Sequence, residues 1–268
     1  MKPVVAVSNQ KGGVGKTTTA INLAASLCRR GRTVLLIDMD PQANLTSGIG
    51  LKGRPAPGGT VYNALMSDST VSVMDFVVPT SVSGLSLIPA DRNLTGAELE
   101  LVGLPNRESR LVPLVTGARG HYDFVFIDTP PSLGLLTLNA LVAVDQVLIP
   151  MTCEYFALEG LAELTATLQR VRAGLNRNLE IGGVLLTMAD SRTNLGRQVS
   201  AEVRGFFKDK VFTTVIPRNV RLGEAPSYGL PAIVYDKRSR GAAAYIALAD
   251  EILGLEQTLD MARSSESA

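Results

Sequence analysis

The sequence predicts a single doubly wound α/β domain in which helices flank a mostly parallel sheet. The apolar runs at residues 34–37 and 124–127 are continuous rather than alternating, as expected of strands covered on both faces. Strand-like runs also alternate with segments of helical periodicity, which favours right-handed β-α-β units. We place the domain at residues 1–256 and expect residues 257–268 to form a flexible C-terminal tail.

The expected elements follow one another along the chain. Strands are predicted at residues 4–7, 32–38, 85–89, 122–128, 146–150, 183–188 and 211–216. Helices are predicted at residues 20–25, 61–66, 97–102, 109–118, 134–142, 156–175, 195–207 and 242–253. Residues 48–59 are rich in glycine and proline and are expected to form a loop.

Composition narrows the class of protein. The 268 residues are 46% apolar and 19% charged, with a net charge of +1, which suits a well-buried core. Few apolar residues precede Ser8, so we expect no signal peptide. No uncharged apolar stretch reaches membrane-spanning length, and we therefore expect a cytoplasmic protein. Cys28 and Cys153 lie far apart without nearby Cys or His, and we expect small buried side chains rather than a metal site.

A glycine-rich turn between the first predicted strand and the first predicted helix indicates a ligand-binding site. It reads Lys11-Gly12-Gly13-Val14-Gly15-Lys16-Thr17-Thr18. Glycines let backbone N–H groups approach an anion, and the helix N-terminus adds partial positive charge. We expect this loop to bind nucleotide phosphates, with Lys16 at the β/γ-phosphates and the Thr17 hydroxyl on Mg²⁺. A glycine turn without a ligand is the alternative.

The loop departs from the usual pattern, in which a glycine stands at the position of Gln10. A second lysine, Lys11, follows directly. The sequence therefore predicts a deviant form of the phosphate-binding loop.

Three aspartates lie at or just after the ends of two predicted strands. Asp38 and Asp40 come after residues 34–37, and Asp128 comes after residues 124–127. The carboxyl ends of parallel strands are where ligands bind. We expect Asp128 to hold Mg²⁺ through water, opposite Thr17, with Asp38 as a second metal candidate.

Each aspartate also has a structural alternative. Asp38 could be a buried, hydrogen-bonded strand end, and Asp128 could cap a turn. Asp40 could be the N-cap of a helix that begins at Pro41.

A basic segment lies near the C-terminus, where residues 190–240 carry ten Lys/Arg against five Asp/Glu. Arg197 and Arg204 are predicted to share a helix face opposite Val199, Val203 and Phe206. The candidate DNA contacts are Arg192, Arg197, Arg204, Arg221, Lys237, Arg238 and Arg240. No helix-turn-helix or zinc pattern accompanies them, so we expect sequence-independent backbone contacts. A merely solvated basic surface is the alternative.

Six stretches resemble ParA-type chromosome-partitioning ATPases of the Soj branch, which carry a deviant Walker A motif. They are K-G-G-V-G-K-T-T-T, D-M-D-P-Q, F-I-D-T-P-P-S-L-G, C-E-Y-F-A-L-E-G-L, S-R-T-N-L-G and I-P-R-N-V-R-L-G-E-A-P-S. The resemblance implies an ATP-dependent sandwich homodimer that binds double-stranded DNA nonspecifically and associates with the nucleoid. It also implies slow, Mg²⁺-dependent ATP hydrolysis, stimulated by a ParB-type centromere-binding partner.

The resemblance further implies roles for individual residues. Lys11 would contact phosphates bound by the partner subunit, and Asp40 would orient or deprotonate the attacking water. Pro217, Arg218 and Asn219 would lie near the adenine. Arg192 and Arg221 are the preferred DNA contacts.

Two other functions are compatible with the same phosphate-binding loop. A MinD-like membrane-associated cell-division ATPase would need a basic amphipathic C-terminal helix, whereas residues 250–260 are acidic, so no membrane contact is expected. A metabolic or reductase P-loop enzyme that shares a metal cluster across its dimer would need cysteines near the carboxyl edge of the sheet. Cys28, inside the first predicted helix, is badly placed for that.

Overall fold

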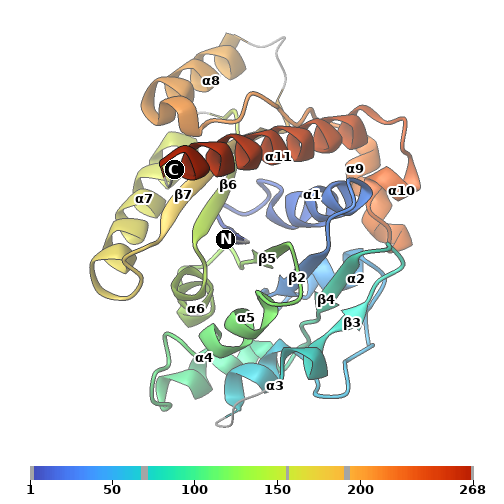
Figure 1. Ribbon diagram of the computed structural model, residues 1–268, viewed down its shortest axis with the longest axis vertical. Helices are drawn as coiled ribbons and strands as arrows, with labels where there is room; N and C mark the ends of the chain where they lie inside the picture. The colour runs from blue at the N-terminus through green and yellow to red at the C-terminus, as the bar shows by residue number, and fades with distance from the viewer. Residues whose placement is uncertain (1–2, 68–71, 155–156, 190–193, 267–268) are drawn as a thin grey trace.

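The computed structural model describes residues 3–67, 72–154, 157–189 and 194–266. Its centre is a seven-stranded sheet with the order β3-β4-β2-β5-β1-β6-β7 (Figure 1). The strands are β1 (Val4–Val7), β2 (Val34–Asp38), β3 (Val78–Pro79), β4 (Leu85–Ile88), β5 (Phe124–Asp128), β6 (Gln146–Thr152) and β7 (Glu180–Thr187). All neighbouring strands are parallel except β3, which is antiparallel to β4. The predicted fold class is confirmed.

Helices cover both faces of this sheet (Figure 1). The longer ones are α1 (Lys16–Arg29), α4 (Leu94–Val102), α5 (Val112–Ala118), α6 (Leu135–Ala143), α7 (Ala157–Gly174), α8 (Asn194–Phe207) and α11 (Arg240–Glu266). The shorter ones are α2 (Asn44–Gly48), α3 (Val61–Met66), α9 (Val220–Glu224), α10 (Ala232–Tyr235) and the 3₁₀ turns η1 (Val73–Phe76), η2 (Lys208–Lys210) and η3 (Ala225–Tyr228). Among the described residues, none of these helices has both the length and the apolar character to cross a membrane.

Two hydrophobic cores explain why the strand sequences are apolar without interruption. On β2, Leu35 and Ile37 pack into the core formed with α3 to α8. Val34 and Leu36, between them in sequence, pack into the core formed with α1, α2 and α9 to α11. Because successive side chains of a strand point to opposite faces, both faces must be apolar.

Helix α1 is held to the C-terminal part of the chain by buried polar contacts. The hydroxyls of Thr19 and Tyr245 lie 3.0 Å apart. Asn22 Oδ1 accepts a hydrogen bond from the backbone N–H of Ala232 at 2.8 Å, while Asn22 Nδ2 donates to the Thr18 carbonyl at 2.8 Å. The helix that follows the glycine-rich loop is therefore bonded directly to α10 and α11.

The predicted strand at residues 211–216 is wrong. This segment runs beside β7 but forms only isolated bridges, at Val211 and Pro217. Between them, the backbone N–H groups of Thr213 and Thr214 donate to the Glu251 carboxylate on α11, at 2.7 and 2.9 Å. Because these donors are bonded to a side chain, they do not extend the sheet.

The last helix is longer than predicted. We expected it to end at residue 253, whereas α11 continues to Glu266. Helical backbone therefore extends into the segment proposed as a tail. The flexibility of that segment and the domain boundary at residue 256 stay predictions.

Candidate nucleotide site and basic surface

The glycine-rich loop and two of the predicted aspartates meet at one edge of the sheet. Val7, the last residue of β1, pairs in register with Asp128 on β5, and Asp128 pairs with Asp38 on β2. The loop leaves β1 at this edge and enters α1. Residues separated by more than 100 positions are thus brought together where parallel sheets bind ligands.

Backbone conformation shows why the loop needs glycine. Gly13 and Gly15 have φ angles of 75° and 87°, a region in which L side chains are strained. The Thr187 hydroxyl donates to the Val14 carbonyl at 2.8 Å, which ties the loop to the end of β7. Within the described residues, the N–H groups of Gly13, Val14 and Gly15 donate no hydrogen bond. Such unsatisfied donors suit an anion such as a phosphate.

Thr17 and Asp128 form the polar pair expected of a magnesium site. The Thr17 hydroxyl donates to Asp128 Oδ2 at 2.7 Å. The other oxygen, Asp128 Oδ1, is buried and has no hydrogen-bond partner among the described residues. Buried polar atoms are normally satisfied, so this oxygen fits a hydrated cation. The Lys16 ammonium lies nearby and donates to the Lys11 carbonyl at 3.3 Å.

The site concentrates negative charge. Burial raises the pKa of Asp128 well above its usual range, and the neighbouring Asp38 raises it further. Burial also raises the pKa of Asp38 to about 6, against the opposing effect of hydrogen bonds from Thr46. Burial lowers the pKa of Lys16, whereas Asp128 and Asp40 oppose that change. Lys16 interacts with two of the three aspartates at this edge, Asp128 and Asp40, so the site favours additional positive charge.

A cation here would need ligands beyond the protein. Within the described residues, no cluster of three His, Cys, Asp or Glu side chains could hold a metal ion. Mg²⁺ commonly takes one or two carboxylates together with phosphate oxygens and water. The residues present fit a metal that arrives with a nucleotide.

Asp38 also has a clear structural role. It is fully buried, and its Oδ2 accepts from both the backbone N–H and the hydroxyl of Thr46, at 2.9 and 2.6 Å. The partner Thr46 is itself buried, and it was not identified from the sequence because nothing in its local pattern distinguishes it from the other threonines. Direct metal binding by Asp38 stays a prediction.

Asp40 does not cap a helix at Pro41, so that alternative is wrong. A turn closed by the hydrogen bond from Ala43 N–H to the Asp40 carbonyl precedes α2, which begins only at Asn44. The Asp40 carboxylate accepts from the Gln42 N–H at 2.9 Å. This local bond fixes the side chain at the rim of the site.

Two further predicted groups are Lys11, the first residue of the loop, and the segment 217–219. The Lys11 ammonium pairs with Glu154 at 2.7 Å, and both side chains are partly exposed. Pro217 is bridged to Ala189, just beyond the end of β7. The segment 217–219 therefore begins beside the end of the strand that is tied to the loop.

Comparison with known proteins decides the family. A family model described as an AAA domain matches residues 2–181. The chromosome partitioning protein ParA of Myxococcus xanthus is 54% identical over 250 residues, covering 93% of this chain and 87% of that protein. The sporulation initiation inhibitor protein Soj of Bacillus subtilis is 54% identical over 252 residues, covering 94% and 98%. The chain belongs to the ParA/Soj family of chromosome-partitioning ATPases.

Solved structures share the ParA/Soj fold under other names. A cobyrinic acid a,c-diamide synthase from Mycobacterium smegmatis, solved with ADP and magnesium, is 38% identical with a TM-score of 0.80 and 94% coverage of each chain. The cell division ATPase MinD of Pyrococcus furiosus is 26% identical with a TM-score of 0.77, covering 95% of this chain and all of that one. The fold thus supports several functions, and the sequence matches to ParA and Soj are the stronger ones.

The candidate basic residues that the structure describes in this ParA/Soj chain differ in their surroundings. Arg221 pairs with Glu224 at 2.7 Å and with Asp236 at 3.3 Å, while Lys237 and Arg238 are exposed. Arg197, Arg204 and Arg240 instead line a common cavity. Arg192 lies outside the described residues. The DNA contacts stay predictions.

The predicted buried face of α8 needs one correction. Val199 and Val203 are buried, as expected, but Phe206 is 70% exposed and Phe207 is buried in its place. The spacing of four between Val199, Val203 and Phe207 continues one helical stripe, whereas Phe206 falls outside it.

Proposed function

We propose that this chain is an ATP-dependent chromosome- or plasmid-partitioning ATPase. ATP and Mg²⁺ binding would drive formation of a sandwich homodimer that binds nonspecific DNA on the nucleoid. Slow hydrolysis, stimulated by a ParB-type centromere-binding partner, would reset it. The proposal rests on one observation: the glycine-rich loop lies beside the hydrogen-bonded pair Thr17 and Asp128. The second carboxylate oxygen of Asp128 is buried and has no partner among the described residues.

The reaction would be phosphoryl transfer from ATP to water. Lys16 and the free N–H groups of Gly13 and Gly15 would bind the phosphates and neutralise charge that develops on them. Thr17 and Asp128 would hold Mg²⁺, which supplies further neutralisation of phosphate charge when bound. These groups are already aligned by the register of β1 and β5.

Two residues would control the attacking water and the dimer. Asp40, anchored by the Gln42 N–H, would orient or deprotonate the water. Lys11 would reach the phosphates of the partner subunit, as arginine fingers do in other ATPases, where they contribute about 10³ to 10⁵ in rate. Its exposed ion pair with Glu154 is of a weak class, about 0–1 kcal/mol, and could be exchanged for a phosphate.

The hydrolysis proposal is tested with Asp40→Ala, using Asp209→Ala, an exposed carboxylate on η2, as the matched control. We expect Asp40→Ala to keep ATP binding and ATP-dependent dimerisation but to lose turnover, because only the water would be affected. ATP affinity, sedimentation and phosphate release are measured for both variants. Turnover in Asp40→Ala equal to that of the control would remove this role.

The DNA proposal is tested with Arg221→Glu, using Arg29→Glu, an exposed residue at the end of α1, as the charge-matched control. Binding to random duplex DNA is measured with ATP, with ADP and without nucleotide. We expect ATP-dependent binding that Arg221→Glu weakens at least tenfold and Arg29→Glu leaves intact. If about five phosphates are contacted, affinity should fall by about two to three orders of magnitude between roughly 50 and 200 mM salt. Binding independent of nucleotide would contradict the proposal.

A MinD-like membrane function is the second candidate, because the MinD structure of Pyrococcus furiosus shares the fold. Sedimentation with anionic liposomes separates the two candidates. The acidic segment 250–260 leads us to expect no ATP-dependent cosedimentation.

A further inference from the structure

The end of β7 contacts the phosphate-binding loop through two neighbouring residues. The Thr187 hydroxyl donates a hydrogen bond to the Val14 carbonyl at 2.8 Å, and both residues are buried. The terminal methyl carbon of Met188 lies 3.9 Å from the position that a Cβ atom of Gly15 would occupy. Consecutive residues of the strand end therefore contact consecutive residues of the loop.

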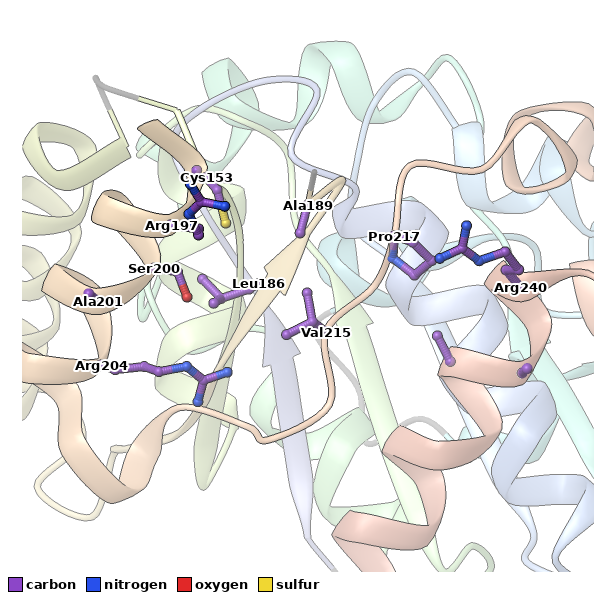
Figure 2. Close-up of a pocket in the computed structure, with 13 residues that line it drawn as sticks. Cys153, Leu186, Ala189, Arg197, Ser200, Ala201, Arg204, Val215, Pro217 and Arg240 are labelled. Atoms are coloured by element: carbon purple, nitrogen blue, oxygen red, sulfur yellow. The ribbon is translucent and has the colours of Figure 1, made fainter. Parts of the chain in front are cut away.

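The strand end that carries Thr187 is itself fixed in place. On one side it pairs in register with the end of β6. On the other side, the Ile216 N–H donates to the Leu186 carbonyl at 2.9 Å, and the Ala189 N–H donates to the Ile216 carbonyl at 3.1 Å. Figure 2 shows this end of β7, from Leu186 to Ala189, beside Pro217. Because hydrogen bonds precede and follow Thr187 on the strand, its hydroxyl has a fixed position relative to the sheet.

The peptide unit between Val14 and Gly15 is not fixed by α1. The first hydrogen bond of this helix runs from the Thr19 N–H to the Gly15 carbonyl at 2.8 Å, so it holds the peptide that follows Gly15. The preceding peptide is trans and planar, so the Gly15 N–H points away from the Val14 carbonyl and hence away from Thr187.

Glycine makes this peptide free to rotate, because it tolerates a φ angle of either sign. Gly15 has a φ angle of 87°. Rotation to the opposite sign would turn the Val14 carbonyl oxygen to the side on which the Gly15 N–H now lies. The hydrogen bond from Thr187 opposes that rotation, because rotation would leave the buried Val14 carbonyl without this donor.

We propose that Thr187 is a positioning residue for the nucleotide phosphates. Its hydroxyl holds the Val14 carbonyl, so that the Gly15 N–H keeps the direction in which it donates to a phosphate oxygen. This inference rests on the proposed function, which assigns that N–H to the phosphates. A donor aligned before the nucleotide arrives avoids the cost of ordering the loop on binding. A rotated peptide would instead present a carbonyl oxygen, which repels a phosphate.

The test compares two substitutions of Thr187. Thr187→Val removes the hydroxyl and nearly keeps the shape, whereas Thr187→Ser keeps the hydroxyl and removes the methyl group. The control is Thr137→Val on α6, because Thr137 is also buried and its hydroxyl donates to the Ser132 carbonyl at 2.6 Å. The control thus removes the same kind of hydrogen bond outside the loop.

The affinity for ADP with Mg²⁺ is measured by calorimetric titration, and stability is measured by urea unfolding. ADP is used because it carries phosphates but is not hydrolysed. We expect Thr187→Val to weaken ADP binding about fivefold or more, as expected for one lost hydrogen bond. Thr187→Ser and Thr137→Val should bind ADP within about twofold of the wild type, although Thr137→Val also loses stability.

A second measurement observes the Gly15 amide itself, by nuclear magnetic resonance of ¹⁵N-labelled protein. In the wild type and Thr187→Ser, we expect saturating ADP with Mg²⁺ to move the Gly15 amide proton downfield, because this proton then donates to a phosphate. In Thr187→Val the shift should be at most about half as large. A hydroxyl that only stabilised the fold would leave the shift at saturation unchanged.

The outcomes separate this inference from the proposed function. Equal ADP affinity and an equal Gly15 shift in the wild type and Thr187→Val would overturn the positioning role and leave the ATPase proposal standing. An equal loss of affinity in Thr187→Ser and Thr187→Val would also overturn it, because the methyl group would then be responsible. A wild type that binds neither ADP nor ATP would refute the proposed function, and this inference with it.

Discussion

The buried carboxyl group of Asp38 should make the nucleotide-free protein less stable as pH rises. Its pKa is raised from 3.8 to about 6, mainly by burial. The folded state therefore binds more protons than the unfolded state between these values, and the free energy of unfolding falls as pH increases through that window. The full effect at neutral pH is about 3 kcal/mol, at 1.36 kcal/mol per pKa unit. Between pH 5 and 7.5 the expected loss is about 1.4 kcal/mol.

Urea unfolding at pH 5, 6 and 7.5 measures this loss, with Asp38→Asn as the test variant and the exposed Asp75→Asn as its control. We expect Asp38→Asn to flatten the dependence on pH by about 1.4 kcal/mol or more, since the charge on Asp38 also raises the pKa of Asp128. Carboxylates with lowered pKa values, such as Glu154 and Asp250, titrate below this range. Identical pH dependence in the wild type and Asp38→Asn would refute the reasoning.

Two further predictions concern α1 and the loop before it. Tyr245→Phe removes the buried hydroxyl bonded to Thr19 and should lower the free energy of unfolding by about 1–3 kcal/mol, measured by urea denaturation; an unchanged midpoint would contradict the contact. Gly13→Ala and Gly31→Ala both place a side chain at positive φ in open space and should each cost about 1–2 kcal/mol. Calorimetric titration should show ATP affinity reduced at least tenfold only in Gly13→Ala, and an equal reduction in both would point to a global effect.

The sequence was most informative where a local pattern fully determines the structure. The continuous apolar runs ending in Asp38 and Asp128 became neighbouring strands in register, because strands that are apolar throughout must be buried on both faces. The phosphate-binding loop could also be predicted from the sequence. Gly13 and Gly15 adopt positive φ angles, which glycine tolerates best, and the motif has glycine at both positions.

Errors arose where a partner distant in sequence decides the outcome. The donors of residues 213 and 214 bond to Glu251, which no local pattern links to them. The pairing of Arg221 with Asp236 likewise depends on how α9 and α10 meet. For the same reason, the cavity shared by Arg204 and Arg240 could not be inferred from their spacing, because it depends on where α8 lies relative to α11.

The bond from Asn22 to the start of α10 has a thermodynamic consequence. The first turn of α1 carries Thr17 and Thr18, which belong to the proposed nucleotide site. Its second turn carries Asn22, which bonds to Ala232 at the start of α10. One helix thus joins the nucleotide site to the part of the chain that carries the proposed DNA contact Arg221. If ATP raises DNA affinity by some factor through this helix, linkage requires that DNA raise ATP affinity by the same factor. Saturating duplex DNA should therefore slow ATP dissociation from the wild type, and Asn22→Ala should weaken both effects in equal measure.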